Sequence, residues 1–139
     1  MNKNKLSDYL DHIQQAATEA GDFIKGMSKD DFLSDRRTQN AVVMSLIVMG
    51  EASAKVMDIY AGFAVNHAVV PWRKMRGMRN RITHGYFEVD FEMVWDTVTT
   101  ALPALLEQLS CVREDADDES HNDDGNGING INGINGIKS

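Results

Sequence analysis

The chain of 139 residues is long enough for one domain with a hydrophobic core, and its composition suggests no second domain. Hydrophobic residues make up 42% of the sequence and aromatic residues 7%, a balance that favours a helical core over a β-rich one. The single cysteine, Cys111, excludes an intramolecular disulfide and is typical of a reducing compartment. Residues 1–15 contain no apolar segment typical of a signal peptide, and no apolar run is long enough to span a bilayer. We therefore expect a cytoplasmic protein without membrane contact.

The net charge of −7 is unevenly distributed along the chain. Residues 111–139 contain seven of the 21 acidic residues and two of the 14 basic ones, so residues 1–110 are close to neutral. No acidic residue occurs between Asp58 and Glu88. The same interval contains five basic residues, which are Arg73, Lys74, Arg76, Arg79 and Arg81. Such a basic segment is a candidate site for an anion or a nucleic acid, the alternative being a solvated helix face.

The apolar periodicity predicts two long helices in the first half of the chain. The first covers about residues 6–24, with Ser7 as its N-cap, and a short helical turn then starts near Ser28. The second covers about residues 35–61 and is apolar on nearly every side between residues 41 and 49. A helix of this kind is buried within its own fold or against a second copy of the chain.

Two further helices are predicted in the second half. Residues 62–70 form a connector, after which Pro71 occupies the first position of the third helix. The fourth helix covers residue 91 to about residue 110, with Asp90 as its cap and a kink or restart at Pro103. Four helices with short links predict an all-α antiparallel bundle of four to five helices.

The apolar pattern stops beyond residue 110. Residues 114–124 are acidic and polar, and residues 126–137 repeat Asn-Gly-Ile four times. A three-residue period with glycine in every unit neither supports a helix nor buries enough surface to fold alone. We therefore divide the chain into a helical bundle, residues 1–110, and a disordered tail, residues 111–139.

Residues 79–86, with the sequence RNRITHGY, contain two arginines, a histidine and a tyrosine, which are side chains that commonly act in catalysis or anion binding. An arginine offers a planar fork of donors to phosphate oxygens, and a histidine can transfer a proton near neutral pH. Gly85 is expected to end the third helix, where the helix macrodipole favours a protonated His84. Together Arg79 and His84 suit phosphodiester cleavage without a metal. They lie roughly 140° apart around an unbroken helix, so they converge only if the helix unwinds near Thr83 or if two subunits contribute.

These residues also have purely structural interpretations. Arg79 and Arg81 would then be solvated, and His84-Gly85 would be no more than the end of a helix. Glu51 and Lys55 form an i,i+4 surface pair, unless Glu51 turns inward to take part in function. The histidines and the cysteine show no metal-ligand spacing, and no glycine-rich phosphate loop precedes a helix, so we expect no metal or cofactor.

Arg79, His84 and Tyr86 match the pattern R-x4-H-x-Y, and the sequence around them extends the match. The further matching segments are residues 32–42, 50–52, 70–73, 77–81, 84–87 and 94–96. In these segments, which span about residues 6–110, the chain resembles HEPN-domain toxins of the HepT type.

The resemblance implies a homodimeric all-α bundle in which the two motifs face each other. It also implies a metal-independent endoribonuclease that acts as the toxin of a toxin–antitoxin pair, with RNA as its substrate and tRNA as the first candidate. Arg79 would bind the scissile phosphate, and His84 would act as general acid or base for attack by the 2′-hydroxyl, leaving a 2′,3′-cyclic phosphate. A cognate MNT-type nucleotidyltransferase would neutralise the toxin by transferring AMP to Tyr86, adding bulk and negative charge.

Several neighbouring residues are candidates for supporting roles. Asn80, one helical turn before His84, would orient the imidazole or contact RNA. The other RNA-binding or supporting candidates are Arg81, Arg76, Arg73 and Glu51. The alternative hypothesis is a non-catalytic helical binding subunit that partners a nucleotidyltransferase or binds a nucleotide.

Overall fold

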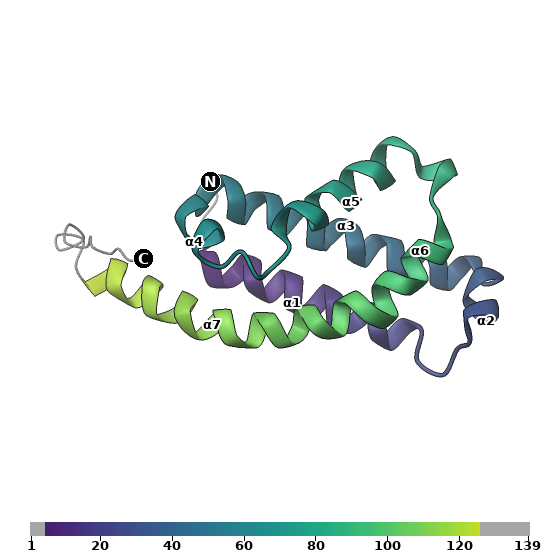
Figure 1. The fold of residues 1–139 in the computed structure, drawn as a ribbon, viewed down its shortest axis with the longest axis horizontal. Helices are drawn as coiled ribbons and strands as arrows, with labels where there is room; N and C mark the ends of the chain where they lie inside the picture. The colour runs from purple at the N-terminus through teal and green to yellow at the C-terminus, as the bar shows by residue number, and fades with distance from the viewer. Residues whose placement is uncertain (1–4, 126–139) are drawn as a thin grey trace.

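The computed structural model describes residues 5–125, with side chains described for residues 5–115. All regular elements in this part of the chain are helical, which confirms the predicted all-α class. α3 and α7 pack on α1, and α5 packs on α3; in Figure 1, α1 and α5 run opposite to α3 and α7. The long helices of this antiparallel bundle are α1 (Leu6–Phe23), α3 (Arg36–Ile59), α5 (Trp72–His84) and α7 (Leu102–Gly125).

Side-chain caps set the starts of the first helices. The N-cap of α1 is Lys5 rather than the predicted Ser7, because the Asp8 carboxylate accepts the Lys5 backbone N–H at 2.8 Å and fixes the earlier start. The short turn expected near Ser28 is α2 (Lys29–Leu33), and the Ser28 hydroxyl caps it by accepting the Asp31 backbone N–H.

The long second helix starts where the sequence predicted. Asp35 is the N-cap of α3, and its carboxylate accepts the Thr38 backbone N–H at 3.1 Å and the Thr38 hydroxyl at 2.9 Å. These two hydrogen bonds stabilise the charged form and lower the pKa of Asp35 below its usual value.

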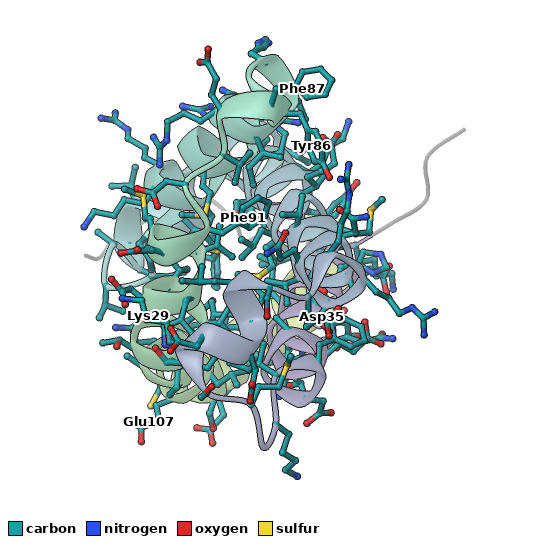
Figure 2. All side chains as sticks on the ribbon, turned by 90° about the vertical axis from the view of Figure 1, so that its right-hand side faces the viewer. Lys29, Asp35, Tyr86, Phe87, Phe91 and Glu107 are labelled. Atoms are coloured by element: carbon teal, nitrogen blue, oxygen red, sulfur yellow. The ribbon has the colours of Figure 1, made fainter. Side chains whose placement is uncertain are left out.

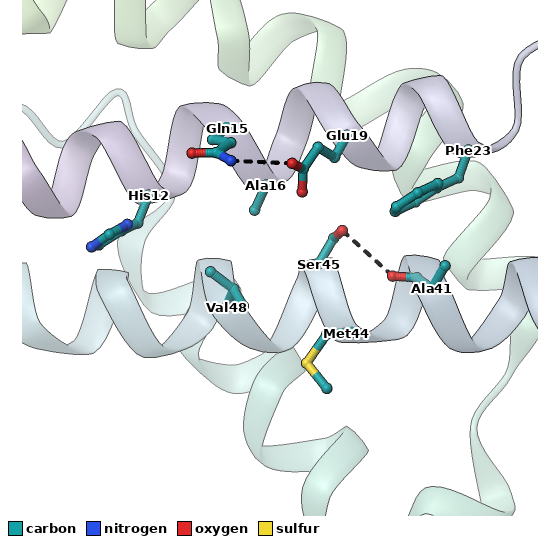
Figure 3. Close-up of a pocket in the computed structure, with 9 residues that line it drawn as sticks. All are labelled: His12, Gln15, Ala16, Glu19, Phe23, Ala41, Met44, Ser45 and Val48. Atoms are coloured by element: carbon teal, nitrogen blue, oxygen red, sulfur yellow. Dashed lines mark hydrogen bonds between the residues drawn. The ribbon is translucent and has the colours of Figure 1, made fainter.

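The core lies where α1, α3 and α7 meet and includes fully buried side chains such as Leu10, Val42 and Leu109. α3 is not buried on every side within the chain, because Met44 is 59% exposed. Met44 and Val48 line an open groove of about 360 Å³ between α1 and α3 (Figure 3). The alternative that a second copy covers this side of α3 therefore stays a prediction.

The predicted connector over residues 62–70 is partly wrong. Its first part is the short helix α4 (Ala61–Asn66), which forms because Phe63 is buried against Trp72, with ring centroids 6.3 Å apart. Packing of this aromatic side chain thus stabilises a short helix where a connector was predicted.

The fourth helix is divided in the way that Pro103 suggested. Asp90 caps α6 (Phe91–Asp96) as predicted, and a π-helical segment, η2 (Thr97–Ala101), joins α6 to α7. The wider turn accommodates the ring of Pro103, which would clash with the carbonyl of Thr99 in a regular α-helix.

The predicted end of this helix near residue 110 is wrong, since α7 continues to Gly125. Val112 is buried in the core, and the Arg113 side chain forms an ion pair with Asp11 and donates to Gln14 Oε1 at 2.8 Å. These contacts with α1 extend the bundle into the segment that composition had assigned to the tail. The Asn-Gly-Ile repeat lies outside the described residues. Within the described residues, no helix has the length and hydropathy needed to cross a membrane.

Candidate functional site

The basic segment of the sequence lies on α5, which is anchored on α3 by an apolar side. Trp72, Met75 and Ile82 are buried, and the Trp72 indole N–H donates to the His67 carbonyl at 3.2 Å. Pro71 caps the helix instead of occupying its first turn, because its ψ of 66° is not helical. This anchoring leaves Arg73 and Arg81 exposed, whereas Arg76 and Arg79 are partly buried.

Arg79 lies at the closest approach between α5 and α3. A Cβ atom placed on Gly50 of α3 would lie 2.2 Å from the Arg79 Cβ and 2.7 Å from the Met75 carbonyl oxygen. Only glycine fits this position without moving one of the helices. Gly50 therefore sets the position of Arg79, a role that the sequence alone did not indicate.

The guanidinium of Arg79 is held on two sides. Its Nη1 group forms an ion pair with the Glu51 carboxylate, and its Nε–H donates to the Asn80 Oδ1 at 2.8 Å. The Arg79 side chain is 22% exposed and that of Glu51 is 55% exposed, so the pair lies at the surface. The pair leaves the Nη2 protons of Arg79 available to a ligand, since neither contact uses them. No ion pair between Glu51 and Lys55 is found among the described side chains.

His84 is the last residue of α5, and its side chain is exposed. In the described part of the chain its ring has no hydrogen-bond or ion-pair partner, which leaves both nitrogens accessible. The helix is continuous to His84, so the predicted unwinding near Thr83 is not observed. Within one chain, Arg79 and His84 consequently point to different sides of α5.

The remaining basic candidates lie along the same helix. Arg73 and Arg81 are exposed, and Arg76 is partly buried. None of the three has an acidic partner among the described side chains. The Arg81 guanidinium extends over Gly77, where a Cβ would lie 3.6 Å from its Nη1. These unpaired charges make α5 a suitable surface for a polyanion.

Tyr86 is in the short 3-10 helix η1 (Tyr86–Glu88), which follows α5 after the cap residue Gly85. Its hydroxyl donates to Oδ1 of Asn40 on α3 at 2.6 Å. The neighbouring Phe87 is 96% exposed, and Figure 2 shows Phe87 and Tyr86 together near the top of the molecule, with Phe91 further toward its centre. The sequence predicted neither Asn40 nor Phe87 as a site residue.

An open pocket lies against this turn, between the start of α3 and the rings of Tyr86 and Phe87. Its volume is about 360 Å³. The polar groups of its lining include Arg36 and Asn40, and the apolar ones include Leu33 and Phe91. Neither Arg79 nor Glu51 is part of this lining, so the pocket and the Arg79–Glu51 pair are separate features.

Comparison with known proteins identifies the family. A family model described as Ribonuclease HepT-like matches residues 13–112. A Thermococcus cleftensis protein named Probable ribonuclease HepT is 35% identical over 112 residues, which cover 81% of this chain and 99% of that protein. A Caldanaerobacter subterraneus protein whose name describes a candidate RNase is 36% identical over 101 residues, or 73% of this chain and 88% of that protein.

A third relative, from Methanocaldococcus jannaschii and also named as a candidate RNase, is 32% identical over 122 residues, covering 88% of this chain and 98% of that protein. No solved structure matches the chain significantly. The family model covers most of the bundle, including all of α5 and η1, and confirms the resemblance to HepT-type HEPN proteins. The chain therefore belongs to the HepT-like ribonuclease family.

Proposed function

We propose that the protein is a metal-independent endoribonuclease in which Arg79 and His84 carry out the cleavage. The observation that carries this proposal is the constrained Arg79 guanidinium on a basic helix that ends at an accessible histidine. The free Nη2 protons of Arg79 bind the non-bridging oxygens of the scissile phosphate and stabilise the charge that develops there. His84 accepts the proton of the 2′-hydroxyl or protonates the leaving 5′-oxygen. The 2′-oxygen bonds to phosphorus as the bond to the 5′-oxygen breaks, and a 2′,3′-cyclic phosphate results.

The two groups act together across a homodimer. One subunit supplies Arg79 and the other His84, because both residues belong to one continuous helix and point to different sides of it. Mixing two inactive variants, Arg79→Ala and His84→Ala, then restores about one quarter of the wild-type activity. Half of the randomly mixed dimers are hybrids, and each hybrid has one of its two sites intact. A mixture that stays inactive, although the subunits exchange, would contradict the shared site.

The cleavage test uses purified protein and cellular RNA, with tRNA as the first substrate, in the presence of a chelator. His84→Ala is expected to lower the cleavage rate by roughly 10²–10⁴, the usual range for loss of a general acid or base. Lys25→Ala, which removes an exposed positive charge outside α5, is the control and should cleave like the wild type. RNA that stays intact with the unmodified protein, while a partner still binds, would favour the non-catalytic binding subunit.

The same proposal includes a toxin–antitoxin pair with an MNT-type nucleotidyltransferase that adds AMP to Tyr86. In support, the Tyr86 side chain is partly exposed and lies two residues after His84. The intact mass of the protein, expressed with and without the partner enzyme, tests this modification. An added AMP mass that disappears in Tyr86→Phe is the expected result. An unchanged mass would mean that any inhibition comes from binding alone.

A further inference from the structure

Phe87 is unusual because a phenylalanine is normally among the buried side chains of a small domain. It is 96% exposed, and it follows the 79–86 motif directly in the sequence. Its only ring neighbour in the described structure is Tyr86, in an edge-on arrangement with centroids 6.0 Å apart and an interplanar angle of 77°. With 96% of Phe87 exposed, at least one face of its ring is open to solvent, so the ring can stack on a flat ligand.

The pocket beside Phe87 combines this ring with unpaired hydrogen-bond donors. Arg36 has no acidic partner among the described side chains, since the adjacent Asp35 carboxylate is engaged by Thr38. Asn40 uses its Oδ1 to accept the Tyr86 hydroxyl, and its Nδ2 donors have no partner among the described residues. The volume of about 360 Å³ is at the lower end of the roughly 300–1,000 Å³ typical of small-ligand sites.

We propose that this pocket binds one nucleobase of the RNA substrate, which stacks on Phe87 while Arg36 and Asn40 donate hydrogen bonds to it or to its phosphate. This inference rests on the proposed ribonuclease function and assigns a base-binding subsite to it. Recognition of single-stranded RNA depends on such aromatic stacking combined with donors to base edges and phosphate.

The subsite lies close enough to the reacting groups to take a nucleotide near the cleaved bond. Phe87 is three positions after His84 in the sequence, so their backbones are at most about 10–11 Å apart. The unpaired Arg36 makes the pocket attractive to an RNA strand and unattractive to a purely apolar partner segment. These features favour a base over a second copy of the chain as the occupant.

The test measures binding of a fluorescently labelled single-stranded oligoribonucleotide of mixed sequence by anisotropy, with all proteins carrying His84→Ala so that the RNA stays intact. Phe87→Ala should raise the Kd roughly 5- to 150-fold, which corresponds to the loss of one stacked base. Phe87→Trp should retain the affinity because an indole stacks as well as a phenyl ring. Val65→Ala is the matched control, since it truncates a 74% exposed apolar side chain on α4, at the other end of the molecule (Figure 1).

A set of oligoribonucleotides that carry one abasic nucleotide at successive positions identifies the stacked base. At one position, the abasic nucleotide should weaken binding to the protein with Phe87 and leave binding to Phe87→Ala unchanged. Equal affinity of both proteins for the intact RNA would overturn the subsite. A change in sedimentation with Phe87→Ala, without RNA, would also overturn it and identify Phe87 as a contact between copies.

The cleavage assay separates the two proposals. In one outcome, the protein with wild-type His84 cleaves RNA while Phe87→Ala leaves the Kd for RNA unchanged. That result rejects the base subsite and leaves the ribonuclease proposal intact. RNA that is neither bound nor cleaved rejects both proposals.

Discussion

Gly50→Ala is expected to disturb the site by separating α5 from α3. The added Cβ would lie 2.2 Å from the Arg79 Cβ, and the nearest ordinary contact distance is 3.4 Å, so the helices must move apart by about 1.2 Å. A second close atom, the Met75 carbonyl oxygen, belongs to the backbone and cannot rotate away. Overpacking of this kind costs about 1–3 kcal/mol, against which alanine gains up to about 1 kcal/mol of helix propensity.

Gly21→Ala in α1 is the matched control because a Cβ there meets no atom within 4 Å. We expect Gly21→Ala to raise the free energy of unfolding by roughly 0.5–1 kcal/mol. The free energy of unfolding of Gly50→Ala should be about 1–3 kcal/mol lower than that of Gly21→Ala. Urea unfolding followed by circular dichroism measures both. A displacement of about 1 Å can also lower a cleavage rate by up to about 100-fold. If Gly50→Ala is as stable as Gly21→Ala and cleaves RNA at the wild-type rate, Gly50 does not position Arg79.

Three further changes test other parts of the molecule. Because its pKa is lowered on folding, Asp35 stabilises the protein above its ordinary pKa of 3.8, and this stabilisation is lost as the pH falls through the lower folded value. Asp35→Asn keeps an N-cap without the charge, so the variant should lack this part of the pH dependence of the urea midpoint. Glu51→Gln should slow RNA cleavage without weakening the binding of uncut RNA, since it loosens Arg79 and removes a negative charge beside the phosphate; a raised Kd would contradict this role. Phe32→Ala should cost about 3–5 kcal/mol in urea unfolding, because the buried ring packs against Phe91 and Trp95 at 6.3 and 5.6 Å; a loss below 1 kcal/mol would contradict this packing.

The sequence predicted the helices whose signals are local. Asp90 was identified as a cap, and the helix starts near Ser28 and Asp35 were placed correctly, because capping depends on side chains within three residues of the helix start. The N-cap of α1 was misassigned to Ser7 because Lys5 caps the helix through the Asp8 carboxylate, which the sequence analysis did not consider.

The sequence could not predict features that depend on contacts between distant segments. Composition assigned residues 111–125 to a tail, whereas α7 continues because Val112 is buried and Arg113 reaches Asp11, about a hundred residues earlier in the chain. The same limit applies at the site. Neither Gly50 nor Asn40 carries a local signal, since their roles arise only when α5 and η1 pack against α3.

α3 positions the motif at two separate points, which constrains how a modification of Tyr86 could act. Asn40 holds the Tyr86 hydroxyl and Glu51 holds Arg79, and these two residues are about 16 Å apart along the helix. An AMP group on Tyr86 replaces the hydroxyl proton that Asn40 accepts, so the ring must leave that contact. Tyr86 lines the Phe87 pocket and Arg79 does not, so an adenylate on Tyr86 would be attached at the edge of that pocket. In the proposed regulation, AMP therefore inhibits by displacing the RNA base from that pocket, and a pre-modified protein should lose the affinity difference between Phe87 and Phe87→Ala.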